Sequence, residues 1–176
     1  MSLPSIDFLN ECFTLDSTTG KLYWNKRPLN HFATEAGWKR VNTKYAGKEA
    51  GCIKGLGYRY VNVNGEFYGN HRIVWKMTTG VDPLNIVHKN DIFFDNRFEN
   101  LMEATKTQVQ QHTKLRNVNH STGFKGVRKV ENSLKYNARI TLNGVLINLG
   151  MFDTAEEAHQ VYMNRAKSAF GEFANA

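Results

Sequence analysis

The sequence has few of the features that mark secreted or membrane proteins. It contains only two cysteines, Cys12 and Cys52, which cannot form a four-cysteine zinc site and are not expected to form a disulfide framework. No apolar run approaches the roughly 20 residues that a membrane-spanning helix needs. The first residues, MSLPSIDFLNECF, lack the basic and then apolar pattern of a secretory signal. We therefore expect a cytoplasmic protein with no membrane partner.

Acidic residues are also scarce. The 176 residues include 23 Lys and Arg against 16 Asp and Glu, which gives a net charge of +7. Between Thr113 and Arg139 the only acidic residue is Glu131. A basic run is often just a solvated face, but this one enters a strand pattern and has Phe124 and Tyr136 interleaved with it. These features favour a surface that binds nucleic acid.

Apolar periodicity predicts short helices and strands in the first two thirds of the chain. The segments YRYVNV (58–63) and EFYGNH (66–71) flank Asn64-Gly65, a pair that suits the tight turn of a β-hairpin. No structure is assigned to residues 26–50. The other predictions here are a helix over 5–14, a strand over 21–25, a helix over 71–80, a strand over 85–88 and a helix over 96–112.

The pattern changes after residues 113–122, which have no apolar periodicity and are predicted to be a linker. Three strands are predicted next, over 123–130, 135–142 and 145–152. Asn143-Gly144 predicts a second hairpin turn between the last two strands. Thr154 and Glu157 have the spacing of a capping box and predict the start of a helix with an apolar stripe. The expected product is a three-stranded antiparallel sheet packed on one helix.

Two stretches resemble known families. Residues 58–112 resemble an HNH nuclease domain of the phage homing-endonuclease kind, through the hairpin leading to His71-Arg72, the segment IVHKNDIFFDNRFENL and the helix after it. Residues 121–173 look like an Apetala2-type (ethylene-response-factor) DNA-binding domain, through GFKGVRK, YNARITLNG, LGMFDTAEEA and GEF. The order of the two domains is also similar to that of phage nucleases.

The resemblance implies an α+β fold with four parts. They are an N-terminal helix and strand region (1–57), a ββα-metal HNH domain (58–112), a linker (113–122) and an Apetala2-type DNA-binding domain (121–176).

The HNH resemblance also implies a set of catalytic positions. Hydrolysis of a phosphodiester needs an activated water and a metal that stabilises the developing charge. His88 takes the position of the general base, a role suited to a side chain with a pKa of about 6.5. Asn100 takes the position that holds the loop and orients this histidine, and Asn96 is a further polar residue of the same segment.

The expected metal ligands are missing. Their positions are occupied by Val87 and Val109, and valine has no oxygen or nitrogen donor for a hard divalent cation. Asp91, Asp95 and His112 are the remaining nearby donors. We therefore expect no cofactor, and Mg²⁺ only if the protein is an active enzyme. Asp91 also replaces the glycine that a tight turn often needs at this point of the loop.

The Apetala2 resemblance implies that the sheet lies in the major groove and presents alternate side chains to base edges. Arg128 follows Gly126-Val127 as the contacting arginine of that family does. Asn148 replaces a tryptophan that is frequent in plant members, and an asparagine can pair with adenine through two hydrogen bonds. The predicted DNA-binding residues are Lys114, Arg116, Lys125, Arg128, Lys129, Lys135, Arg139 and Asn148.

These observations predict a sequence-specific binder of double-stranded DNA with an inactive nuclease centre. It would act by occupying its site, as a repressor does. The alternative is an active HNH endonuclease that depends on a divalent metal and makes nicks or double-strand breaks. A third interpretation, with less support, is an RNA-binding or protein-interaction module. Cleavage of DNA in magnesium or manganese would favour the enzyme.

Overall fold

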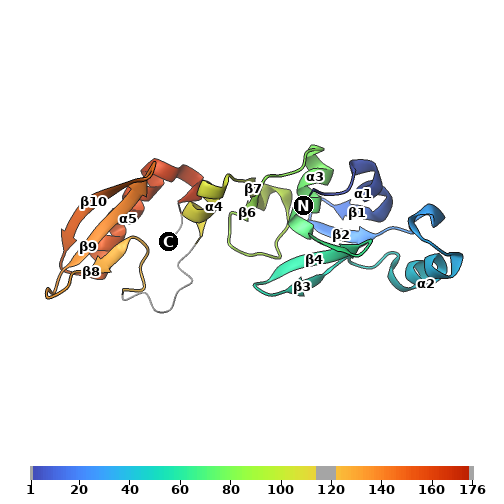
Figure 1. Cartoon of the computed structure of the whole chain (residues 1–176), viewed down its shortest axis with the longest axis horizontal. Coiled ribbons are helices and arrows are strands. Elements are labelled where there is room, and N and C mark those ends of the chain that lie inside the picture. Colours follow the sequence, from blue (N-terminus) through green and yellow to red (C-terminus); the bar gives the residue numbers. More distant parts are fainter. Residues whose placement is uncertain (1, 114–121, 175–176) are drawn as a thin grey trace. The chain divides into compact units, whose positions relative to one another are not determined.

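The computed structural model describes residues 2–113 and 122–174 (Figure 1). They form two compact units, Met1–Ala104 and Thr105–Ala176. Both units combine helices with small antiparallel sheets. No described helix is long and apolar enough to cross a membrane. Most of the predicted linker, residues 114–121, lies outside the described residues. The division between the units falls before it, at Thr105.

The N-terminal unit contains three helices and three sheets, in the strand orders β1-β2, β3-β4-β5 and β6-β7. Its helices are α1 (Ile6–Cys12), α2 (Glu35–Tyr45) and α3 (Asn70–Thr79), with short 3-10 turns η1 (Leu29–His31) and η2 (Phe98–Asn100). Its strands are β1 (Phe13–Asp16), β2 (Lys21–Trp24), β3 (Cys52–Lys54), β4 (Tyr58–Val63), β5 (Glu66–Gly69), β6 (Ile86–His88) and β7 (Leu101–Glu103).

The C-terminal unit contains one sheet with the strand order β10-β9-β8. Its elements are α4 (Lys106–His112), β8 (Val127–Lys129), β9 (Tyr136–Leu142), β10 (Val145–Phe152), α5 (Ala155–Phe170) and the 3-10 turn η3 (Gly171–Phe173). All three strands are antiparallel to their neighbours. The predicted arrangement of three strands and one long helix is therefore present.

The two predicted hairpins form because their turn residues accept a left-handed backbone. Asn64 and Gly65 have φ angles of 53° and 91°, and β4 pairs with β5 around them. Asn143 and Gly144, with φ angles of 50° and 80°, join β9 to β10 in the same way. Positive φ at both central residues matches the twist of the flanking strands.

The prediction of one helix over 96–112 is wrong. This stretch forms η2, then β7, and then α4, which belongs to the C-terminal unit. β7 pairs with β6, so Leu101 lies opposite His88. A new helix starts after Thr105, whose hydroxyl accepts from the Gln108 backbone while the Gln108 side chain accepts from the Thr105 backbone. This capping box is a helix-start signal that the apolar pattern concealed.

Three further elements were not predicted: β1, α2 and β3. The longest, α2, lies inside residues 26–50. Its start is fixed by Thr34, whose hydroxyl accepts from the backbone N–H of Gly37. Its apolar stripe is weak, and the one buried residue of α2 is the polar Asn42. The Asn42 side-chain amide hydrogen-bonds to the backbone of Arg27.

The C-terminal unit has its core between α5 and one face of the sheet. Val127, Ala138 and Ile140 are buried from the sheet side. Ala158, Tyr162 and Ala166 are buried from α5. The spacing of the three helical residues puts them on one face, because positions three and four apart are neighbours on a helix. The opposite face of the sheet is thus left uncovered by α5.

Candidate functional site

The first candidate site is the hairpin of β6 and β7 with the loop between them. Asn100 holds this loop: its amide donates to the Asp95 carbonyl at 2.8 Å, and its Oδ1 accepts from the backbone N–H of Asn90 at 3.0 Å. Asp91 adopts a φ of +58° in the turn. The position therefore has the left-handed backbone that favours glycine. These contacts give Asn100 the loop-holding place expected for it.

His88 lies at the end of β6 and is held by a neighbour in the same loop. Its Nε2 donates to Asn96 Oδ1 at 3.0 Å. The roles expected of Asn100 alone are therefore divided, because Asn100 ties the loop and Asn96 contacts the histidine.

Aromatic rings surround His88. The ring of Phe93 stacks on that of Tyr58 with centroids 4.5 Å apart, and both rings contact His88, at 6.0 and 5.8 Å. His71 from α3 lies 5.4 Å from His88. His88 is only 1% exposed as a result. A general base has to reach the attacking water or the substrate, and this histidine is covered from both.

The residues around His88 do not fit a divalent metal. Val87 is buried on β6 opposite Met102 and offers no donor atom. Asp95, a possible substitute, is paired with Arg97 at 2.7 Å and accepts from the Asn90 amide at 2.9 Å. The Arg97 hydrogen bonds, together with Asn90, lower the pKa of Asp95 to about 2. Across residues 2–113 and 122–174, no group of three or more His, Cys, Asp or Glu side chains is arranged to hold a metal ion.

The second expected metal position, Val109, and the nearby donor His112 are on α4. Val109 is half-buried there and His112 is buried. Both residues therefore belong to the C-terminal unit, whereas His88 and Val87 belong to the N-terminal unit.

The buried His71 makes the stability of the N-terminal unit depend on pH. Burial, with added repulsion from His88 and Arg72, lowers the pKa of His71 to about 3. In the unfolded chain this pKa returns to about 6.5. Between these two pKa values the unfolded state therefore binds a proton that the folded state does not bind. The stabilising effect is complete above pH 6.5 and is lost as the pH falls.

We expect His71 to reduce the unfolding free energy by about 2 kcal/mol between pH 7.5 and pH 5. Urea denaturation at several pH values measures this change. The His71→Gln variant should show a flatter pH profile over the same range. An equally steep profile in that variant would assign the pH dependence to other groups.

The second candidate site is the outer face of the C-terminal sheet, defined here as the side opposite α5. Because Ala138 and Ile140 face α5, alternation along β9 turns Asn137 and Arg139 to the outer face. The strand register places Arg128 of β8 beside Asn137, and Asn148 of β10 beside Arg139. Three of the predicted DNA-binding residues therefore share one surface: Arg128, Arg139 and Asn148.

Asn148 lies at an irregularity in β10, where the register shifts between Asn148 and Gly150. Its Oδ1 accepts from the backbone N–H of Gly150 at 3.0 Å and from the Asn137 amide at 2.8 Å. These bonds use both lone pairs of the oxygen. The two-bond contact with adenine expected of Asn148 would need them to break, so the structure favours a local role in shaping the sheet.

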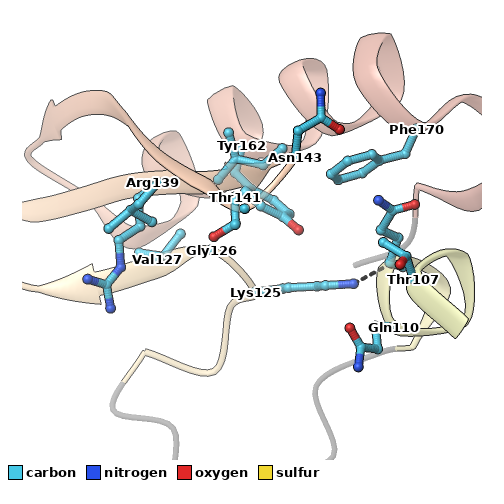
Figure 2. A pocket seen from close by; sticks show the side chains of 14 residues that line it. Thr107, Gln110, Lys125, Gly126, Val127, Arg139, Thr141, Asn143, Tyr162 and Phe170 are labelled. Atoms are coloured by element: carbon cyan, nitrogen blue, oxygen red, sulfur yellow. Dashed lines mark hydrogen bonds between the residues drawn. The ribbon is translucent and has the colours of Figure 1, made fainter.

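Lys125, another of the residues predicted to bind DNA, directs its side chain to α4 and not to the outer face. Its side chain is half-buried, and its Nζ donates to the carbonyls of Gln111 and Thr113 at the end of α4. Burial lowers its pKa. This lysine satisfies carbonyls that the helix leaves without partners. It also lines a pocket of about 950 Å³, together with Tyr162 and Phe170 (Figure 2).

The remaining predicted DNA-binding residues are distributed differently. Lys129 is exposed, and in the strand register it lies opposite Tyr136. Because the Tyr136 ring packs on the helix side, Lys129 is not on the outer face. Lys135 is exposed and pairs with Asp153 at 3.0 Å. Lys114 and Arg116 lie outside the described residues.

Comparison with known proteins agrees with the first site. Residues 68–111 match the HNH endonuclease family. This HNH segment includes α3, the β6–β7 hairpin and most of α4. A protein named as an uncharacterized HNH endonuclease, from Acanthamoeba polyphaga mimivirus, is 34% identical over 88 residues, or 48% of this chain. The match covers 46% of that protein, so the chain spans about half the length of this relative. No solved structure is significantly similar to the chain.

Proposed function

We propose that the chain is a sequence-specific double-stranded DNA-binding protein with an HNH segment that no longer cleaves DNA. The observation that carries the proposal is the outer face of the C-terminal sheet, where Arg128 and Arg139 are side by side with Asn137 on a surface that α5 does not cover. A twisted sheet of this width can enter the major groove, and arginine is the side chain that most often reads guanine there. The resemblance to the Apetala2-type domain supports the same use of this face.

Loss of cleavage is supported by two features of the HNH segment. His88 is buried under Tyr58 and Phe93. Val87 and Val109 occupy the positions where metal ligands are expected, and a valine side chain has no donor atom that could bind a metal. Without an accessible base or a metal to stabilise the developing charge, binding is the activity that remains. The protein would then act by occupying its site, as a repressor does.

One observation favours the alternative of an active divalent-metal-dependent HNH endonuclease. His88 and Asn96 retain a hydrogen bond that orients the imidazole, and Asn100 still holds the loop. A nuclease that has lost its function need not keep this arrangement. Cleavage assays in magnesium and manganese discriminate between the two functions.

We expect Arg128→Ala and Arg139→Ala each to weaken specific duplex binding by about 1–3 kcal/mol. The duplex is selected from a random DNA pool with the unmodified protein, and affinity is measured by fluorescence anisotropy at fixed salt. Arg165→Ala is the matched control, because this exposed arginine lies on α5 and its loss changes the net charge equally. If the control weakens binding as much as the sheet variants do, the outer face is not the reading surface.

A further inference from the structure

The N-terminal unit has a second concentration of basic and aromatic side chains, separate from the outer face. Between Lys21 and Arg59 the chain has nine Lys and Arg against two acidic residues, Glu35 and Glu49. Part of this stretch lines a pocket of about 570 Å³, in which Arg27 is the only Lys or Arg of the lining and Glu49 is its acidic residue. The volume is in the range of small-molecule and single-nucleotide sites. Its lining includes Trp24, Arg27, Phe32, Tyr45, Tyr60 and Phe67.

Arg27 is the unusual residue of this pocket. It is only 6% exposed, and it makes no ion pair with any described residue. Within the described part of the chain, its side chain makes one hydrogen bond, from Nη2 to Asn64 Oδ1 at 3.3 Å. Its Nε is buried without a partner there. The guanidinium carbon lies 4.5 Å from the centre of the Phe32 ring and 5.6 Å from that of Trp24.

A buried charge without a counter-ion is costly, because it has lost its hydration and gained little in return. Stacking of the guanidinium on the Phe32 and Trp24 rings offsets part of this cost. The remaining donors of a guanidinium are a planar set that matches the oxygens of a phosphate. The guanidinium of Arg27 is therefore available to bind an anion that enters the pocket.

Two exposed aromatic rings of the lining are paired with lysines. Phe67 of β5 is 51% exposed, and the Nζ of Lys54 lies 3.4 Å from its ring centre. Tyr45, at the end of α2, is 40% exposed and has Lys44 at 5.1 Å. Flat rings beside basic side chains are typical of surfaces that stack bases and contact the phosphate backbone of single strands.

We propose that this pocket binds an unpaired nucleotide of single-stranded nucleic acid, with its phosphate on Arg27 and its base stacked on Phe67. A duplex does not fit this role, because its bases are stacked internally and its phosphates cannot reach a buried guanidinium. The contrast with the outer face supports the distinction, since the side chain of Arg128 is 56% exposed. This site is independent of the proposed duplex-reading surface.

The test uses the full chain and a fluorescein-labelled dT8 oligonucleotide in anisotropy titrations, with U8 and a duplex of equal length alongside. Phe67→Ser and Arg27→Met should each weaken dT8 or U8 binding about tenfold. Phe94→Ser is the matched control, because Phe94 is 61% exposed on the N-terminal unit but does not line this pocket. It should bind as the unmodified protein does.

Thermal unfolding separates loss of binding from loss of folding. Arg27→Met removes a buried side chain, whereas Phe67→Ser and Lys54→Ala change exposed ones and should leave the unfolding midpoint almost unchanged.

Binding of either oligonucleotide that depends on Phe67 supports the proposal, and comparison of dT8 with U8 identifies the preferred sugar. Unchanged affinity in folded Phe67→Ser and Lys54→Ala proteins would overturn it, as would a Phe67-dependent preference for the duplex. Arg139→Ala should not affect dT8 binding, so failure here leaves the duplex proposal separately testable.

Discussion

The Gly126→Ala variant is expected to lose most of the stability of the C-terminal unit. Gly126 has a φ of +75°, and a Cβ built on it would lie 2.1 Å from Cδ2 of Tyr162. The Tyr162 ring cannot move aside easily, because it is buried between α5 and the sheet. Overpacking and backbone strain together should cost about 3 kcal/mol or more. For a unit of this size that is a large share of its stability.

Gly123→Ala is the matched control for this prediction. Gly123 has almost the same φ, +70°, but a Cβ there would meet nothing within 4 Å. Thermal unfolding followed by near-ultraviolet circular dichroism should show a much larger loss for position 126 than for position 123. Equal losses at both positions would mean that backbone strain alone is responsible and that the close approach to Tyr162 is unimportant.

The regular parts of the fold could be predicted because local chemistry determines them. Asn64-Gly65 and Asn143-Gly144 require no tertiary information to form their turns, since both residues accept positive φ. The same holds for α5, where Thr154 caps the first turn and the apolar stripe has helical spacing. In such segments the local preference and the packing of the core agree.

The elements that were missed or wrong depend on partners distant in sequence. Residues 101–103 have no strong strand preference, and they form β7 because β6 offers them a backbone ladder. The helix α2 buries little apolar surface and is linked to Arg27 through the Asn42 amide. A periodicity argument cannot detect contacts of this kind, because they leave no apolar pattern along the chain.

The candidate sites show the same limit. The sequence predicted His88, Asn96 and Asn100 for one site and Arg128 and Arg139 for the sheet surface, and the structure brings the members of each group together. The cover over His88 could not be predicted, because it depends on Phe93 stacking on Tyr58 from another sheet. Lys125 was assigned to DNA by its charge alone, and only its contacts with Gln111 and Thr113 show that it satisfies the end of a helix.

A protein that binds DNA through its C-terminal sheet can tolerate decay of its nuclease centre, because binding does not use that centre. In an active enzyme, a valine at position 87 would remove a metal ligand and would be costly. In a binding protein, the same valine is buried on β6 and no donor atom is needed there. The packing of Phe93 on Tyr58 fits this view, because it stabilises the loop at the expense of access to His88.

We therefore expect no cleavage of plasmid DNA by the unmodified protein in millimolar magnesium or manganese. DNA affinity should be the same with and without a chelator, because no metal takes part in binding. His88→Ala should leave DNA affinity nearly unchanged, since the side chain is buried and cannot contact DNA directly. Gel assays of nicked and linear plasmid, with anisotropy on the selected duplex, measure these three results. Robust cleavage by the unmodified protein that His88→Ala abolishes would overturn the proposed function and establish the enzyme.

Restoring a missing donor tests the cause of the proposed inactivity. Val87→Asp returns an oxygen donor to the expected position next to His88 within the N-terminal unit, so calorimetric titration should then detect weak binding of a divalent metal. This change alone should produce at most weak nicking, because His88 stays covered. Adding Phe93→Ala removes the ring stacked on Tyr58 and should increase nicking further, whereas Phe94→Ala, which removes an exposed neighbouring ring, should not. Equal nicking with either phenylalanine variant would show that the cover over His88 is not what prevents catalysis.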